Sequence, residues 1–172
     1  VALNIGSGDA NINAGDSVIG AHTAPVLGIG ALAIGGGDVD IEAADTTVTA
    51  GAGVAGISVG GNTWIDSGTV TATGSGLAGV GVAGVALGGN VDIDTHGSTD
   101  ANGLFGVFAL AGGGDASITT GGYVNALNGS GVNAIAAGGD ATIDTTAGDV
   151  NSMYMGVGAL ALDGGVTIDT GN

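Results

Sequence analysis

One glycine-punctuated unit recurs along the whole chain. A turn of Gly-Gly, or of Gly followed by Asp or Asn, precedes the pattern x-Ile-x-Thr or a close variant. The anchoring isoleucines are Ile12, Ile41, Ile65, Ile93, Ile118, Ile143 and Ile168, with spacings of 29, 24, 28, 25, 25 and 25 residues. A unit of this length cannot bury its own apolar side chains, so a fixed period of this kind predicts stacked coils, which are typical of a solenoid.

The residues within each unit alternate between apolar and polar, which predicts strands and not helices. Three short strands can be assigned per unit, typified by residues 91–95, 69–73 and 107–111, and Gly, Asn, Asp and Ser separate them. Stacked coils would pair each strand with its equivalents above and below. We therefore predict an all-β fold, a parallel β-helix of about seven rungs of roughly 25 residues with three short strands each. Residues 1–172 would form a single domain, which could belong to a longer chain.

The three predicted strands differ in the surfaces that they present. The first has Val and Ile inside and acidic residues outside, and the second has Val48, Val70, Val124 and Val150 inside with polar residues outside. In the third strand both alternating sets are apolar: a small set rich in Ala and Gly, and a larger set. We interpret the larger set as a candidate interface: Leu32, Ile34, Ile57, Val59, Val85, Leu87, Phe108, Leu110, Ile135, Leu160 and Leu162.

The sequence alone leaves open which of these two sets fills the core. Either choice leaves an apolar stripe outside, longer than soluble monomers usually expose, so the stripe is expected to dock on a partner. The alternative is a harmless solvated sheet of alanine and glycine. Neither end of the sequence shows a capping element, so stacking of coils head to tail is a second expected mode of association.

The charge of the chain restricts its partners. Lys and Arg are absent and Asp plus Glu number 16, which gives a net charge of −16. Such a chain cannot neutralise phosphates, so binding of nucleic acid or of anionic membrane surfaces is not expected. No uninterrupted apolar run reaches the length of a transmembrane helix, so this segment is not expected to insert into a membrane. The expected partners are a second copy of the chain, neutral surfaces and divalent cations.

The outward carboxylates of the first strand form a predicted column of Glu42, Asp66, Asp94, Asp144 and Asp169, with Asp38, Asp115 and Asp140 at the preceding corner. Like charges at rung spacing repel, and relief must come from metal ions, salt or raised pKa values. These residues are therefore weak candidates for binding Ca²⁺, the only cofactor that the sequence suggests. The alternative is a solvated acidic face with diffuse counterions.

Catalysis is not predicted, and no catalytic residues are assigned. Polysaccharide lyases built on β-helices need Arg or Lys to hold the substrate, and the chain has neither. His22 and His96 lie in variable turns and are expected to be surface or corner residues. Trp64 replaces the Asp or Thr of other rungs and could mark a contact.

The segments GGDATIDTTAGDV and GGNVDIDTHGSTDANGLFGVFALAGG resemble the repeats of Gram-negative autotransporter passengers and related large β-helical repeat adhesins. The resemblance covers nearly the whole chain. It implies a right-handed parallel β-helix displayed at, or released from, the cell surface. The function hypothesis is a structural extracellular subunit that self-associates, laterally or head to tail, into a surface or matrix fibre. The alternative is a fragment of an adhesin that contacts a host or a polysaccharide.

Overall fold

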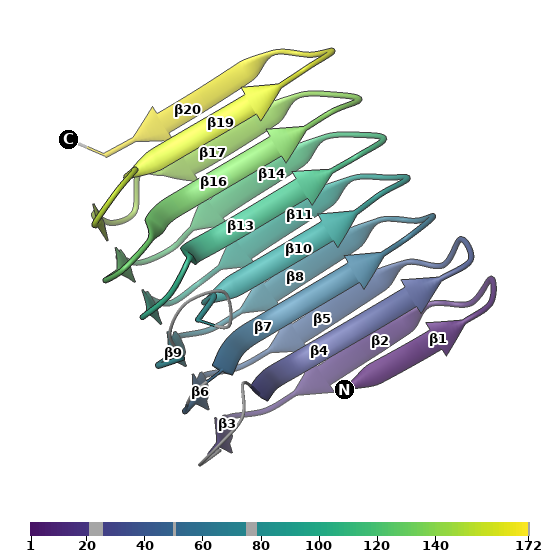
Figure 1. Ribbon diagram of the computed structural model, residues 1–172, viewed down its shortest axis with the longest axis horizontal. Helices are drawn as coiled ribbons and strands as arrows, with labels where there is room; N and C mark the ends of the chain where they lie inside the picture. The colour runs from purple at the N-terminus through teal and green to yellow at the C-terminus, as the bar shows by residue number, and fades with distance from the viewer. Residues whose placement is uncertain (21–25, 50, 75–78, 172) are drawn as a thin grey trace.

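The computed structural model describes residues 1–20, 26–49, 51–74 and 79–171, and within them every regular element is a β-strand. The strands form three parallel sheets, each of which runs the length of the stack (Figure 1). Successive strands of one sheet are three elements apart in the chain, so each turn of the coil contributes one strand to each sheet. The predicted parallel β-solenoid with three strands per coil is confirmed.

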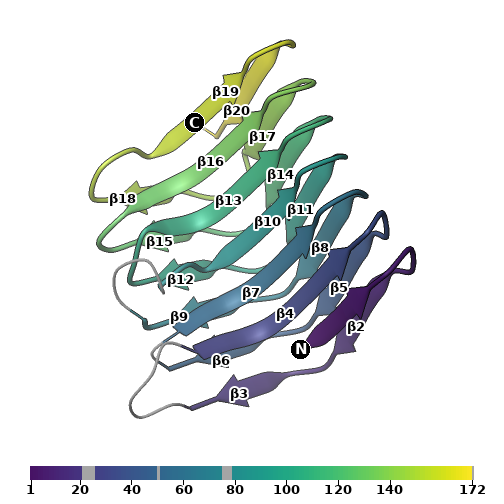
Figure 2. The ribbon, with the colours of Figure 1, turned by 45° about the vertical axis from the view of Figure 1, so that its right-hand side comes forward.

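The three sheets correspond to the three predicted strands of the repeat. Sheet B holds the first: β2 (Ala10–Ala14), β5 (Val39–Ala43), β8 (Thr63–Ser67), β11 (Val91–Thr95), β14 (Ala116–Thr120), β17 (Ala141–Thr145) and β20 (Val166–Thr170). Sheet C holds the second: β3 (Ser17–Ile19), β6 (Thr46–Val48), β9 (Val70–Ala72), β12 (Thr99–Ala101), β15 (Val124–Ala126) and β18 (Val150–Ser152). Sheet A holds the third: β1 (Ala2–Ile5), β4 (Val26–Ile34), β7 (Gly51–Ser58), β10 (Val82–Ala86), β13 (Phe105–Ala111), β16 (Ser130–Ala136) and β19 (Val157–Ala161). Figure 2 shows the short strands of sheet C where the chain crosses from sheet B back to sheet A.

The anchoring isoleucines stack in one column of sheet B, as their spacing predicts. The pairing register joins Ile12, Ile41, Ile65, Ile93, Ile118, Ile143 and Ile168 in that order. The five middle residues of this column are at most 2% exposed. The first and last members belong to the end coils and are less covered. The column forms the spine of a narrow core.

Small residues of sheet A face this spine. Ala31, Gly56, Gly84, Ala109, Ala134 and Ala159 form one inward column. A Cβ atom placed on Gly84 would lie only 2.7 Å from Cγ1 of Val91, and one on Gly56 would lie 2.9 Å from Cγ1 of Val39. Opposite Val and Ile the interior therefore has room for Ala or Gly only, which answers the question that the sequence left open. The larger residues that alternate with this column, from Leu32 to Leu160, face outward.

Sheet C follows the prediction with one difference in register. Val48, Val70 and Val124 are buried as expected, and Val150 is partly buried. Val70 pairs with Thr46, however, while Val48 pairs with Ala72, so the first two valines occupy different columns. Both columns point inward because the residues are two positions apart on a strand.

Hydroxyl side chains line the inside of the corner between sheets B and C. Ser67, Thr95, Thr120 and Thr145 occupy one column and are at most 1% exposed. Among the described residues, the hydroxyls of Ser67, Thr95 and Thr120 have no hydrogen-bond partner. Side-chain size, together with the β-branching of the three threonines, accounts for these residues at this corner better than hydrogen bonding does.

Candidate functional site

The outer face of sheet A is a continuous apolar surface. The register places Leu3, Leu32, Ile57, Val85, Leu110, Ile135 and Leu160 in one outward column. The other predicted interface residues flank this column: Ile34 at the end of β4, Val59 and Leu87 just after β7 and β10, Phe108 on β13, and Leu162 just after β19. Exposure reaches 42% for Ile57, 54% for Leu87 and 66% for Leu162. All eleven predicted side chains therefore lie on one side of the molecule.

The same surface carries no charge. All 16 acidic residues of the chain fall outside the seven strands of sheet A. They belong instead to sheets B and C, to the corners and to the connecting turns. A molecule with a net charge of −16 thus keeps one long face both apolar and uncharged.

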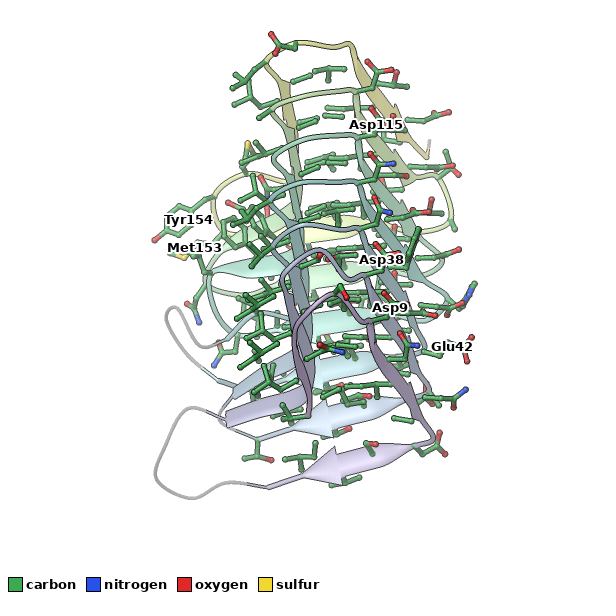
Figure 3. The ribbon with its side chains drawn as sticks, turned by 90° about the vertical axis from the view of Figure 1, so that its right-hand side faces the viewer. Asp9, Asp38, Glu42, Asp115, Met153 and Tyr154 are labelled. Carbon is green, nitrogen blue, oxygen red and sulfur yellow. The ribbon has the colours of Figure 1, made fainter. Side chains whose placement is uncertain are left out.

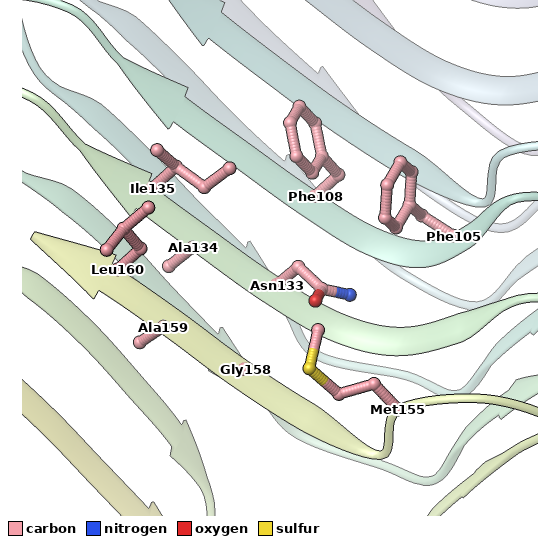
Figure 4. Close-up of a pocket in the computed structure, with 9 residues that line it drawn as sticks. All are labelled: Phe105, Phe108, Asn133, Ala134, Ile135, Met155, Gly158, Ala159 and Leu160. Atoms are coloured by element: carbon pink, nitrogen blue, oxygen red, sulfur yellow. The ribbon is translucent and has the colours of Figure 1, made fainter.

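A hollow of about 430 Å³ opens on this face over β13, β16 and β19 (Figure 4). Phe105 and Phe108 form one wall, with ring centroids 4.7 Å apart and planes 22° apart. Met155 and Leu160 lie on the opposite side. The sequence reasoning included Phe108 and Leu160 but missed Phe105 and Met155, because both lie outside the strict alternation of the strand.

Asn133 lies in the middle of this hollow and is only 5% exposed. Its amide nitrogen, Nδ2, is buried and has no hydrogen-bond partner among the described residues. A buried amide donor without a partner is costly. The sequence carried a signal for it, since Asn133 is the polar residue at an outward position where other rungs have Gly, Ala or Phe.

A smaller apolar hollow of about 270 Å³ lies toward the first coils of sheet A, between Leu3, Leu27, Leu32 and Ile57. Leu27 covers Gly30 there, because a Cβ on Gly30 would lie 2.0 Å from Cδ2 of Leu27. Leu3 and Leu27 were not among the predicted interface residues. Their position extends the apolar face across the whole sheet.

The corner between sheets A and B holds an uninterrupted ladder of Asp and Asn side chains, here called the Asx ladder. In each step a side-chain Oδ1 accepts the backbone N–H of the equivalent residue one rung further on. The N···O distances run from 2.6 to 2.9 Å, and the last donor is the backbone N–H of Gly165, which bonds to Asp140. The accepting residues are Asp9, Asp38, Asn62, Asn90, Asp115 and Asp140. Figure 3 labels Asp9, Asp38 and Asp115 along this edge of the stack. The corner residues Asp38, Asp115 and Asp140 therefore contact backbone donors, which the sequence reasoning had not considered.

The predicted acidic column is divided in two. Glu42, Asp66 and Asp94 occupy adjacent rungs, Thr119 interrupts the column, and Asp144 and Asp169 continue it. The first three, with Asp40 and Asp92 of the neighbouring column, form what we call the acidic patch. It lines a hollow of about 280 Å³ beside Trp64, which is 41% exposed. Within the described ranges no group of three or more His, Asp or Glu residues is arranged to hold a metal ion, and Ca²⁺ binding stays a prediction.

His96 borders the acidic patch. Its Nε2 lies 3.0 Å from Oδ1 of Asp66, and its Nδ1 lies 3.8 Å from Oδ1 of Asp94. The hydrogen bond to Asp66 and the charges of Asp66 and Asp94 raise the pKa of His96 above its ordinary value. His96 is a surface residue as expected, although its pairing with Asp66 was not foreseen, and His22 lies outside the described residues. Asp144 shows the opposite effect, because hydrogen bonding to Thr146 lowers the pKa of its carboxyl.

Comparison of the chain with protein-family models, with curated proteins and with solved structures finds no match. In the part of the chain that the structure describes, no helix is long and apolar enough to cross a membrane. The fold and its surfaces therefore define the class of protein as a parallel β-solenoid with one apolar and one acidic face.

Proposed function

We propose that the chain is a structural subunit of an extracellular or cell-surface fibre and that it self-associates laterally through the outer face of sheet A. The observation that carries this proposal is the segregation of charge, with all 16 carboxylates outside the strands of an exposed apolar sheet. Two copies repel each other through every other side, because each carries a net charge of −16. Contact through sheet A buries apolar area. Each Å² removed from water stabilises the complex by roughly 25 cal/mol, and the loss of translational and rotational freedom on association opposes this gain.

The extracellular location is supported by the resemblance of the repeats to autotransporter passengers and large repeat adhesins. Chains of that kind are displayed on or released from cells, and a stack of parallel coils suits a load-bearing, extended role. Neither the surfaces nor the charge of the chain favour an enzymatic function. Head-to-tail stacking of coils would add length to laterally paired subunits.

The test is a charge placed on the proposed interface. We expect Ile57→Asp to abolish oligomers in sedimentation velocity and filaments in electron microscopy, because a desolvated carboxylate in an apolar contact is costly. Thr47→Asp is the matched control, since Thr47 is exposed on sheet C and receives the same charge change. Circular dichroism would establish that both variants keep the fold. Equal association of the two variants, or a monomeric wild-type chain at high concentration, would refute lateral assembly through sheet A.

The alternative function, an adhesin that binds a polysaccharide, is favoured by one observation. Trp64 is exposed between Asp40 and Asp92 on adjacent rungs of sheet B, and an exposed aromatic ring beside carboxylates suits stacking and hydrogen bonding with a sugar. Binding to a glycan array that disappears in Trp64→Ala would favour the adhesin function. Binding unaffected by Trp64→Ala would exclude this patch as the glycan site.

A further inference from the structure

We infer that the hollow around Trp64 on sheet B binds an organic cation, namely a linear aliphatic polyamine. This inference goes beyond the proposed function, because the hollow lies on sheet B and not on the face of sheet A that would join the subunits. Two features carry it. The first is an aromatic ring in a column that is otherwise polar, and the second is a pair of carboxylates beside the ring that have no partner among the described residues.

The first feature is the position of the Trp64 ring. Its column on sheet B faces outward, and the other rungs hold Asn, Asp, Ser or Thr at this place. The second outward column of the sheet is also polar, with Asn, Glu, Asp or Thr on every rung. The ring is 41% exposed and has no apolar side chain of the strands beside it on this face. Packing on sheet B therefore does not account for a tryptophan here.

The second feature is the state of the carboxylates next to the ring. Asp40 and Asp92 flank Trp64 on the two adjacent rungs, each about 4.8 Å away along the stack. Neither forms a hydrogen bond or an ion pair with the described residues, whereas Asp66 pairs with His96. The chain contains no Lys or Arg, so a cation that pairs with these two carboxylates must come from another molecule.

The ring and the acidic patch line one hollow of about 280 Å³. Carboxylates alone would attract only diffuse counterions, and the ring is what makes this place specific. Tryptophan is the best partner for a cation–π contact, which forms when an ammonium group lies within about 6 Å of the ring centroid. Because neighbouring rungs are so close, an ammonium group over the ring also lies near Asp40 or Asp92.

The same chemistry selects the kind of ligand. A metal ion gains nothing from an indole ring, and no three described His, Asp or Glu residues are arranged to hold one. An uncharged sugar could stack on the ring but would not use the charge around it. A linear polyamine uses both features, since its ammonium groups meet successive carboxylates along the column while its methylene groups cover the ring.

Intrinsic fluorescence tests the inference directly, because Trp64 is the only tryptophan in the sequence. We expect spermidine, titrated into the full chain in about 0.1 M NaCl, to produce a saturable change in this fluorescence. Mg²⁺ at the same ionic strength, and an uncharged cello-oligosaccharide, should leave it unchanged. A titration without saturation, or an equal change with Mg²⁺ or with the oligosaccharide, would overturn the inference.

Two variants separate the contribution of the ring from that of the charges. Trp64→Thr gives this rung the residue that later rungs carry in the same column. We expect it to raise the dissociation constant of spermidine, measured by calorimetry, about three- to five-fold, as for a cation–π contact at a partly exposed ring. Asp40→Asn combined with Asp92→Asn keeps the ring and should raise the constant at least about three-fold.

The matched control is Asp163→Asn combined with Asp169→Asn, which removes two exposed carboxylates in the last coil. Asp169 is four rungs from Trp64, roughly 19 Å along the stack and beyond the Debye length at this salt concentration. This control should therefore bind spermidine like the wild type. Wild-type affinity in Trp64→Thr, or equal weakening in the two double variants, would show diffuse counterion binding and overturn the inference. Circular dichroism would establish that all variants keep the fold.

This inference and the proposed function fail separately. Ile57→Asp changes the face of sheet A and leaves sheet B intact, so it should bind spermidine with the affinity of the wild type whether or not it associates. A monomeric wild-type chain that binds spermidine at Trp64 would refute lateral assembly and leave the cation site standing. A chain that assembles but shows no saturable binding would refute the cation site alone.

Discussion

At the scale of single residues, the size of one side chain decides which way each strand of sheet A faces. Ala109 and Ala134 are fully buried, while Leu110 and Ile135, one position further on, are partly exposed. The core leaves no room for more than a methyl group opposite the isoleucine column. In this part of sheet A the larger apolar side chains therefore point outward, while Val54, Val82, Val107 and Val132 are buried at another inward position of the same strands.

His96 provides a prediction at this scale. Its pKa, followed by NMR titration, should lie above 6.5, first because Asp66 accepts a hydrogen bond from the ring and second because the charges of Asp66 and Asp94 favour the protonated form. We expect Asp66→Asn to return the pKa towards 6.5, and Asp94→Asn to lower it less. An unchanged pKa in Asp66→Asn would contradict the pairing.

The sign of the effect on stability follows from the direction of the shift. The folded-state pKa of His96 is raised above the unfolded value near 6.5, so its pairing contributes fully below pH 6.5. That contribution is lost as the pH rises through the folded-state pKa. The residue is exposed, so solvent screens the effect and the change should be small.

At the scale of the elements, the Asx ladder fixes the corner between sheets A and B. In each rung the chain leaves a strand of sheet A and turns before it enters the next strand of sheet B. The backbone N–H at this turn donates a hydrogen bond to the Asp or Asn side chain at the same corner of the preceding rung. The ladder therefore connects consecutive rungs outside the sheets and gives a physical reason for the Asp or Asn that follows the glycines of the repeat.

The ladder can be tested at Asp115, whose Oδ1 accepts the N–H of Asp140 at 2.8 Å. We expect Asp115→Ala to lower the free energy of unfolding in urea by about 1 kcal/mol, the typical net contribution of one hydrogen bond, because the bond is exposed to solvent. Asp115→Asn keeps an acceptor at the same place and should lose clearly less. Equal free energies of unfolding for Asp115→Ala and Asp115→Asn would show that this hydrogen bond does not stabilise the fold.

At the scale of the whole molecule, charge and apolar surface are separated onto different sides. Sheet A is apolar outside, while the acidic patch lies on sheet B. Stacked rungs hold like charges within about 5 Å of each other, well inside the Debye length of about 10 Å at 0.1 M salt. The native stack therefore tolerates considerable self-repulsion.

Ionic conditions should consequently change stability. We expect the midpoint of thermal unfolding to rise by several degrees between about 0.01 M and 0.5 M NaCl, since screening weakens repulsion among the 16 carboxylates. Ca²⁺ at matched ionic strength should raise it further if the acidic patch binds the ion, and the double variant Asp66→Asn with Asp94→Asn should remove that extra increase. An equal effect of NaCl and CaCl₂ would indicate diffuse counterions only.

The sequence by itself determined the coil, the three strands per unit and the stacking of the isoleucines, because a repeated period and a two-residue alternation specify register directly. It also identified the apolar strand and its two alternating sets, the larger of which contains the eleven candidate interface residues. It did not determine which of two apolar sets is buried, because both satisfy the same alternation. Only the distance across the core, which admits Ala109 but not a larger residue, decided that question. The Asx ladder, the pair of His96 with Asp66 and the hollow at Asn133 likewise depend on contacts between rungs about 25 to 30 residues apart, which only the tertiary structure brings together.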